Sequence, residues 1–165
     1  MSANAARDVA AELRRIRALA EKEAPLAACR AVGQTAETAV MVTLTTFTRT
    51  KDEVTPSKPG QPPALVTGRL RRSIHRTTPR IMEPGVARSA VGSTLIYAPV
   101  HENGPVTIRP KRSAYLKFQY GGVWHTRTQV TIPRRPYLAT ATAKLIATGM
   151  LRKVAEDAWR AVTDL

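Results

Sequence analysis

The chain has 165 residues, 43% of them hydrophobic but only 5% aromatic, and a formal net charge of +14. This length corresponds to about one domain, and no apolar run approaches the roughly 20 residues that a membrane-spanning helix requires. The single cysteine, Cys29, excludes an internal disulfide and a cysteine-built zinc site, and the charged N-terminal stretch does not resemble a secretory signal. The sequence therefore indicates one basic domain made inside the cell, with its partner as the open question.

The positive charge is concentrated in one part of the chain. Residues 65–136 hold thirteen basic residues against two acidic ones, Glu83 and Glu102, and so supply +11 of the +14. Residues 105–136 contain no acidic residue and seven cations: Arg109, Lys111, Arg112, Lys117, Arg127, Arg134 and Arg135. Such a field attracts polyanions or an acidic protein surface. An ordinary soluble surface with a chance bias in charge remains the alternative.

The N-terminal stretch has the pattern of an amphipathic helix over residues 5–24. Val9, Leu13 and Ile16 recur at helical spacing, and charged residues occupy the other side. Pro25 is expected either to end this helix or to open the next one, because proline is tolerated in a helix only in the first turn.

A second helix is predicted for residues 26–47, and the small residues on both helices allow a close approach of helices or of subunits. Cys29 lies on its apolar stripe, which favours a buried small side chain over a reactive thiol. Residues 51–64 contain four prolines, which withhold backbone donors, so an extended and exposed segment is expected there.

The rest of the chain predicts short elements. The first are a short helix over 67–74, strands at 80–82 and 87–91 joined by a turn at 83–85, and a helix over 97–103 capped by Thr94. Strands follow at 106–108, 115–118 and 129–132, with Gly121-Gly122 as the turn between the last two. The last element is a helix over 137–165, weakened at Gly149. The predicted class is α+β: a small antiparallel sheet with an extended β-hairpin, packed against N-terminal helices and a C-terminal helix. We expect a single domain over 1–165, made of helices (1–50), a proline-rich arm (51–66), a basic sheet region (67–136) and the last helix (137–165).

No pattern of catalytic chemistry is present. The three histidines, His75, His101 and His125, have no carboxylate or cysteine at ligand spacing, and the sequence contains neither a nucleophile elbow nor a phosphate-binding glycine loop. We therefore predict no catalytic residue, no cofactor and no metal site, and a protein that is not an enzyme.

Aromatic residues interleave with the basic ones in the second half of the chain, as in a single-strand nucleic-acid binder with stacking platforms. They are Tyr115, Phe118, Tyr120 and Trp124. Alternation of core and surface positions along strands explains the same pattern. No helix-turn-helix, zinc finger or RNA-binding sheet signature is present, so only contact with the backbone of duplex DNA stays open.

Four sequence pieces, in order across residues 57–138, resemble the virion-morphogenesis, tail-completion or neck proteins of long-tailed bacteriophages, a family that includes minor tail proteins. The pieces are Ser57-Lys58-Pro59-Gly60-Gln61-Pro62-Pro63 leading into Thr67-Gly68-Arg69-Leu70-Arg71-Arg72-Ser73-Ile74; Val91-Gly92-Ser93 with Tyr97-Ala98-Pro99-Val100-His101-Glu102-Asn103-Gly104; Ile108-Arg109-Pro110-Lys111 with Leu116-Lys117-Phe118 and Gly121-Gly122-Val123; and Ile132-Pro133-Arg134-Arg135-Pro136-Tyr137-Leu138.

The resemblance implies an architectural role in the virion. Such proteins assemble in the host cytoplasm as rings, here expected to have six subunits, between a head-tail connector or stopper and the tail terminator, around the packaged double-stranded DNA and away from any membrane. The residues expected to contact subunits or partners are Pro59, Pro62, Pro63, Tyr97, His101, Glu102 and Tyr137. The seven cations of residues 105–136 are expected to face a polyanion or an acidic partner. The alternative function is a basic protein that contacts duplex DNA without sequence specificity.

Overall fold

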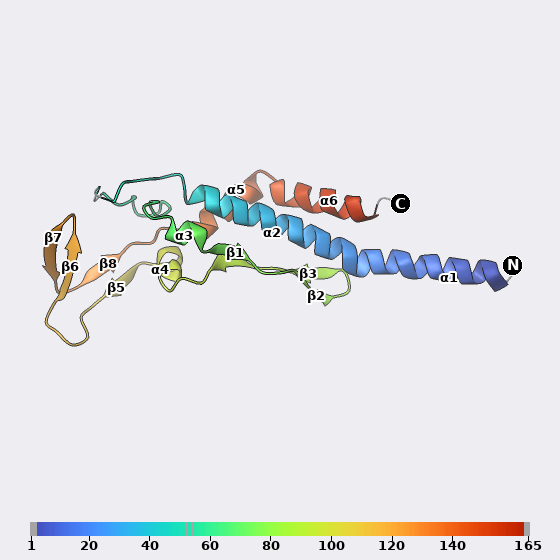
Figure 1. Ribbon diagram of the computed structural model, residues 1–165, viewed down its shortest axis with the longest axis horizontal. Coiled ribbons are helices and arrows are strands. Elements are labelled where there is room, and N and C mark those ends of the chain that lie inside the picture. The colour runs from blue at the N-terminus through green and yellow to red at the C-terminus, as the bar shows by residue number, and fades with distance from the viewer. Residues whose placement is uncertain (1–2, 52, 54, 164–165) are drawn as a thin grey trace. The chain divides into compact units, whose positions relative to one another are not determined.

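The computed structural model describes residues 3–51, 53 and 55–163, and it has the predicted α+β class. By its internal contacts the chain divides into two compact units. Figure 1 labels the helices and strands of which they consist. Unit 1 combines Met1–Glu37, Arg76–Val91 and Leu145–Leu165, and unit 2 combines Thr38–His75 and Gly92–Lys144. Each unit is therefore assembled from separate stretches of sequence. That the whole chain behaves as one domain stays a prediction.

The N-terminal helices form one continuous run. Helix α1 (Ala3–Ala18) leads into a π-helix (Leu19–Glu23) and then into α2 (Ala24–Thr43), and the Ala24 N–H donates to the Leu19 carbonyl five residues back. Pro25 lies in the first turn of α2, so it opens the second helix, as one of the two alternatives predicted.

Helix α2 ends at Thr43, earlier than the predicted position 47. The Thr45 and Thr46 hydroxyls donate to the Val42 and Thr43 carbonyls, at 2.6 and 2.8 Å. Such local bonds from threonine compete with the helical pattern of backbone bonds. The β-branched run therefore stops the helix at its first threonines.

Unit 1 also contains a β-hairpin, formed by β2 and β3. Strands β2 (Arg80–Glu83) and β3 (Val86–Arg88) pair antiparallel, and at their turn the Gly85 N–H donates to the Glu21 carbonyl at 2.9 Å. The prediction that the second strand continues to residue 91 is wrong. Ser89 and Ala90 instead bond to Thr77: the Ser89 hydroxyl donates to the Thr77 carbonyl at 2.7 Å, and the Ala90 N–H to the Thr77 hydroxyl at 2.9 Å.

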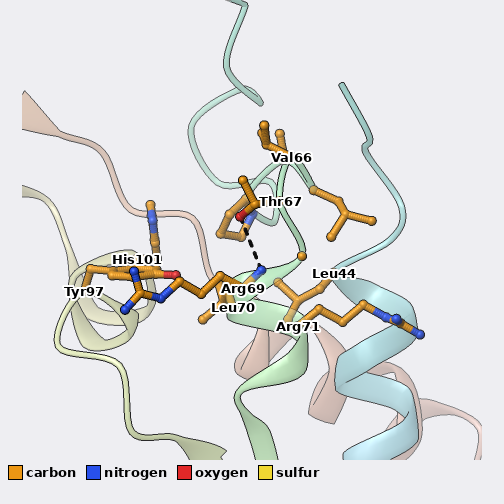
Figure 2. Close-up of a pocket in the computed structure, with 12 residues that line it drawn as sticks. Leu44, Val66, Thr67, Arg69, Leu70, Arg71, Tyr97 and His101 are labelled. Atoms are coloured by element: carbon orange, nitrogen blue, oxygen red, sulfur yellow. Dashed lines mark hydrogen bonds between the residues drawn. The ribbon is translucent and has the colours of Figure 1, made fainter. Parts of the chain in front are cut away.

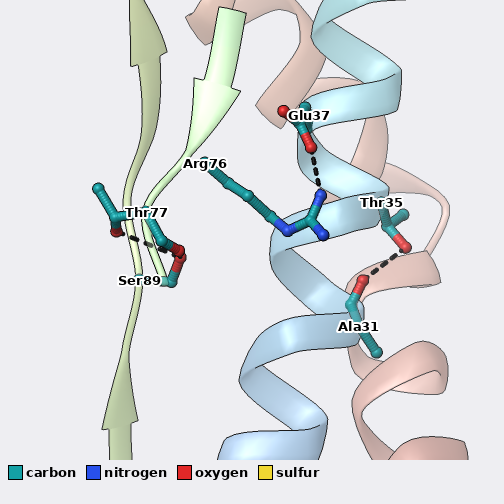
Figure 3. A network of polar contacts seen from close by, with 6 residues as sticks. All are labelled: Ala31, Thr35, Glu37, Arg76, Thr77 and Ser89. Carbon is teal, nitrogen blue, oxygen red and sulfur yellow. Dashed lines mark hydrogen bonds and ion pairs between the residues drawn. The ribbon is translucent and has the colours of Figure 1, made fainter. Parts of the chain in front are cut away.

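Figure 3 shows a second polar link inside unit 1. The guanidinium of Arg76, which precedes strand β2 in the chain, pairs with the carboxylate of Glu37 on α2. Both side chains are largely covered, with 33% and 17% of their surfaces exposed. The pair therefore connects two stretches that lie far apart in the sequence.

The C-terminal helix is interrupted at Gly149, as the sequence indicated. Helix α5 (Leu138–Ala147) and helix α6 (Met150–Thr163) are separated by this glycine, whose φ of +64° lies in the left-handed region. Glycine adopts that conformation without the steric cost that a Cβ would bring.

Four further short elements lie in the middle part of the chain: helix α3 (Arg69–Arg72), strand β1 (Ile74–Arg76), which pairs with β4 (Val91–Ser93), and helix α4 (Ala98–Asn103). All of their residues belong to unit 2 except Arg76 and Val91, which belong to unit 1. Two predictions are wrong here. Gly92 and Ser93 lie in a strand rather than ending one, and Thr94 does not cap α4, whose N-cap Tyr97 makes no side-chain cap bond. The Ser93 hydroxyl forms a hydrogen bond with the Ser73 hydroxyl at 2.7 Å. It also accepts the Leu95 N–H at 3.1 Å, so this backbone donor before α4 is bonded to Ser93.

The predicted hairpin over 106–132 consists of two ladders in succession. Strand β5 (Val106–Ile108) pairs antiparallel with β8 (Val130–Ile132), and β6 (Leu116–Tyr120) pairs antiparallel with β7 (Val123–Arg127). Strand β7 was not predicted, so the turn Gly121-Gly122 was assigned the wrong partner strand. Both glycines have positive φ, as a tight turn between β6 and β7 requires.

The buried apolar side chains lie mainly in unit 2. They are Val40, Leu44, Ile74, Ala98, Tyr137 and Ala141 in unit 2, and Ala24 and Leu145 in unit 1. Tyr137 is the largest of them and is 1% exposed. Among residues 3–51, 53 and 55–163, no helix combines the length and the apolar content that crossing a membrane would need.

Candidate functional site

Glu102 binds the N-terminus of helix α5 with its carboxylate. Its Oε2 accepts the backbone N–H groups of Tyr137 and Leu138, and its Oε1 accepts that of Ala139, each at 2.9 Å. The first N–H groups of a helix have no partner within the helix and carry partial positive charge, so a carboxylate stabilises them. This glutamate from α4 thus holds α4 and α5 together within unit 2.

The two arginines before α5 strengthen the same junction. Arg134 Nε donates to the Glu102 carbonyl, and the Arg135 backbone N–H donates to the His101 carbonyl, both at 2.8 Å. The segment that connects β8 to α5 is therefore bonded to α4 through backbone groups as well as through the Glu102 carboxylate.

Arg135 also binds the proline-rich segment. Its Nε and Nη2 donate to the Ser57 carbonyl at 3.1 and 3.0 Å, and its Nε to the Ser57 hydroxyl at 3.1 Å. Ser57 is 3% exposed, and the Gly60 N–H donates to the Arg134 carbonyl at 2.9 Å. The expected absence of helix and strand holds for the described residues of 51–64, but the expectation of an exposed segment is wrong at Ser57.

A pocket lies between α3 and α4 in unit 2 (Figure 2). Leu44 and Leu70 contribute apolar surface, and Arg69 and Arg71 contribute cations. The rings come from Tyr97, the N-cap of α4, and from His101 within α4. The rings of Tyr97 and His101 lie edge to face, with centroids 6.0 Å apart, and Tyr97 is 38% exposed. The pocket therefore offers a mixed apolar and cationic surface.

Burial changes the protonation of two side chains at this junction. Burial, and then the positive charge of Arg135, lower the pKa of His101 and so favour its neutral imidazole. Burial, followed by the charges of Glu102 and Tyr97, raises the pKa of Tyr137 to about 12. Both shifts favour the uncharged form of the side chain.

A second pocket adjoins the bound Ser57. It is lined by Ser57, Arg135, His101 and Arg49, together with residues of the proline-rich segment. Within the described residues, Arg49 Nε and His101 Nδ1 are buried without a hydrogen-bond partner. Sequence reasoning identified His101 and Arg135 here but not Arg49 or Ser57, whose roles depend on a fold that brings positions far apart together.

The seven cations of residues 105–136 follow the hairpin and its base. All are exposed except Arg135, which is half-buried. Within the part of the chain that the structure describes, none of them forms an ion pair with a carboxylate. Arg109 Nε donates to Gln129 Oε1 at 3.3 Å, which joins the two sides of the hairpin.

Aromatic groups on the hairpin contact their neighbours across the ladder. Lys117 Nζ lies 5.2 Å from the ring centroid of Trp124, within the range of a cation–π contact. Phe118 stacks with His125 at 5.9 Å. Trp124 and Tyr115 stay 62% and 58% exposed, so the hairpin surface carries both positive charge and accessible rings.

The expected contact residues differ in what they can offer to a partner. Pro59 and Tyr97 are exposed, Pro62, Pro63 and His101 are half-buried, and the Glu102 carboxylate is occupied by α5. For Tyr137 the expectation is corrected, because a side chain 1% exposed has no surface for a partner to contact. Tyr137 instead belongs to the buried core.

Metal-ligating residues do not gather anywhere in the described chain: no group of three or more His, Cys, Asp or Glu is placed to hold an ion there. Cys29 is half-buried, and burial raises the pKa of its thiol, which disfavours the reactive thiolate.

No family model matches the chain, and no curated protein or solved structure is significantly similar to it.

Proposed function

We propose that this chain is a structural protein of the head–tail junction of a tailed bacteriophage, where a ring of six copies joins the tail to the head-side connector around the DNA channel. The observation that carries the proposal is the exposed cationic hairpin over 106–132. Its charges have no carboxylate partner within the described residues, so they are available to another molecule.

The base of the hairpin supports this assignment. Strand β8 ends at Ile132, and the next residues are bonded to α4 and to Ser57 by Arg134 and Arg135. These bonds attach the end of the hairpin to the rest of unit 2. An anchored base reduces the entropy that the hairpin loses on binding a partner.

The role is non-catalytic. This proposal is supported by the Glu102 carboxylate, whose two oxygens are already occupied by the backbone N–H groups at the start of α5. The expected partners are the tail terminator, the connector or stopper, and packaged DNA near the ring.

The test combines the purified chain with tails and with connector rings of the phage that encodes it. Light scattering and negative-stain imaging should reveal a ring-sized assembly, either of the chain alone or on its partner. Reversing the charge of Arg109, Lys111 and Lys117 to Glu should weaken attachment, whereas reversing Arg7 and Arg14 on α1 should not. A uniform monomer that binds neither tails nor connectors would contradict the proposal.

The second candidate, direct binding of duplex DNA without sequence specificity, is favoured by the same unpaired cations beside exposed Trp124 and Tyr115. It predicts tight binding near physiological salt, with a log–log salt slope of roughly −0.9 per phosphate neutralised. Replacing Arg109, Lys111, Arg112 and Lys117 by Ala should flatten this slope. If duplex binding has vanished at physiological salt while tail binding persists, this candidate fails and the junction role stands.

A further inference from the structure

Helix α1 is surrounded by solvent along most of its length. Residues 7–18 are all exposed, on every side of the helix. Three of them are large apolar residues: Val9 is 55% exposed, Leu13 62% and Ile16 43%. A helix with an apolar stripe normally buries that stripe against another element, and a helix without such packing is only marginally stable in water.

The spacing of the stripe matches a coiled-coil seam. Val9, Leu13 and Ile16 are separated by four and then three residues, which places Val9 and Ile16 at d positions and Leu13 at an a position of a heptad. Such a seam is narrow and suits another helix lying alongside, rather than a sheet or a broad groove.

The charges beside the seam indicate which helix that is. With Leu13 at position a, Glu12 falls at position g and Arg17 at position e. In a parallel coiled coil, a g residue lies next to the e residue of the following heptad on the neighbour. Glu12 of one copy would therefore meet Arg17 of the next. An antiparallel arrangement brings g next to g and e next to e, and so does not pair Glu12 with Arg17.

The present partners of these two charges do not prevent such pairing. Arg17 bonds Glu21 at 2.8 Å and Glu12 lies 3.7 Å from Arg15, and all four side chains are between 40% and 76% exposed. Exposed pairs within one helix contribute little, so exchanging them for pairs between helices costs little.

We propose that α1 is a self-association helix that packs in parallel against α1 of a second copy through Val9, Leu13 and Ile16, with Glu12 and Arg17 setting the orientation. Copies related by rotation about an axis along the helices lie parallel, as in a closed cyclic assembly. The inference refines the ring proposed above, and rests on that proposal only for the number of copies.

The first experiment measures self-association of the full-length chain, without any phage component, by sedimentation and light scattering over a wide concentration range. Leu13→Asp should weaken association at least 100-fold. The matched control is Ala11→Asp, which adds the same charge to the opposite face of α1 and should change association less than threefold. Circular dichroism checks that both variants keep the wild-type helix content. A wild-type chain that is monomeric at every concentration, or equal effects of the two variants, would overturn the proposal.

The second experiment tests the orientation by charge reversal. Glu12→Arg alone should weaken association at least tenfold, because it places a second guanidinium beside Arg17 of the neighbouring copy. Adding Arg17→Glu should restore association to within threefold of wild type. A double variant as weak as the single one would overturn the parallel arrangement, even if Leu13→Asp still disrupts assembly.

The two proposals fail separately. A chain that never self-associates, and whose Leu13→Asp variant binds tails or connectors as well as the wild type does, refutes only the role of α1. A chain that associates through α1 but ignores tails and connectors refutes only the junction function.

Discussion

Removing the carboxylate of Glu102 tests the central junction of unit 2. This one side chain accepts three backbone N–H groups at 2.9 Å, those of Tyr137, Leu138 and Ala139. Glu102→Ala leaves all three without a protein partner. Losing a helix N-cap costs about 0.5–2 kcal/mol, and a hydrogen bond to a charged group contributes about 1.5–3 kcal/mol. Water can replace the bond at Ala139, which is exposed, so the costs do not sum fully.

We therefore expect Glu102→Ala to lower the free energy of unfolding of unit 2 by about 3 kcal/mol, which corresponds to a fall in Tm of about 10 °C or more for a unit of this size. Glu102→Gln should cost about half as much, because its one remaining carbonyl oxygen can still accept two of the three N–H groups. The assay is urea denaturation together with hydrogen exchange of the amides of Tyr137, Leu138 and Ala139, which reports the loss locally.

The matched control is Glu83→Ala, since Glu83 is an exposed glutamate at the end of β2 in unit 1. An exposed substitution of this kind should change stability by no more than about 0.5 kcal/mol. The reasoning is refuted if Glu102→Ala unfolds at the same urea concentration as Glu83→Ala and the three amides exchange at wild-type rates.

The remaining predictions concern a buried phenol, a glycine and an anchoring arginine. Because the pKa of Tyr137 is raised to about 12 in the fold, stability should fall as pH rises from 10 to 12, and Tyr137→Phe should remove that fall in alkaline denaturation. Gly149 has a φ of +64°, so Gly149→Ala should lower the free energy of unfolding by about 1–2 kcal/mol. The control is Gly92→Ala, since Gly92 also has open space for a Cβ but no positive φ, and its loss should be at most half as large. Equal losses in urea denaturation would contradict the conformational argument. Arg135→Ala should release Ser57 and speed proteolytic cleavage within residues 55–63 about tenfold, and unchanged cleavage would show that the segment is held by other contacts.

Local sequence signals predicted the elements whose cause is local. The helical spacing of Val9, Leu13 and Ile16 and the break at Gly149 depend on neighbouring residues, and the structure has a helix and a break there. For Pro25 the sequence left two alternatives, and the structure has the one in which it opens a helix. The extent of the Val106–Ile132 hairpin was likewise visible from its turn glycines and β-branched residues.

The predictions were wrong where contacts between residues far apart in the sequence determine the extent and pairing of the strands. Val91 joins β4 instead of β3 because Thr77 binds Ser89 and Ala90, and no pattern near residue 91 signals that contact. Strand β7 was missed because its sequence, Val123–Arg127, mixes polar and apolar residues and is recognisable mainly through its pairing with β6.

The candidate site shows the same division. His101, Glu102, Arg134 and Arg135 were singled out from sequence as contact residues, but their partners within the chain could not be read from it. Glu102 lies 35 residues before the first N–H that it accepts, and Arg135 lies 78 residues after the serine that it binds. Such contacts follow from the fold, so the sequence identified the residues without distinguishing bonding within the chain from contact with a partner.

The most direct test of the proposed function is a cryo-electron microscopy map of the intact phage particle, with side-chain detail at the neck. Our account predicts density for this chain in a ring between the head-side connector and the tail, with the 106–132 hairpin against an acidic neighbouring subunit or the DNA. A map that resolves every neck and tail protein and contains no copy of the chain would contradict it.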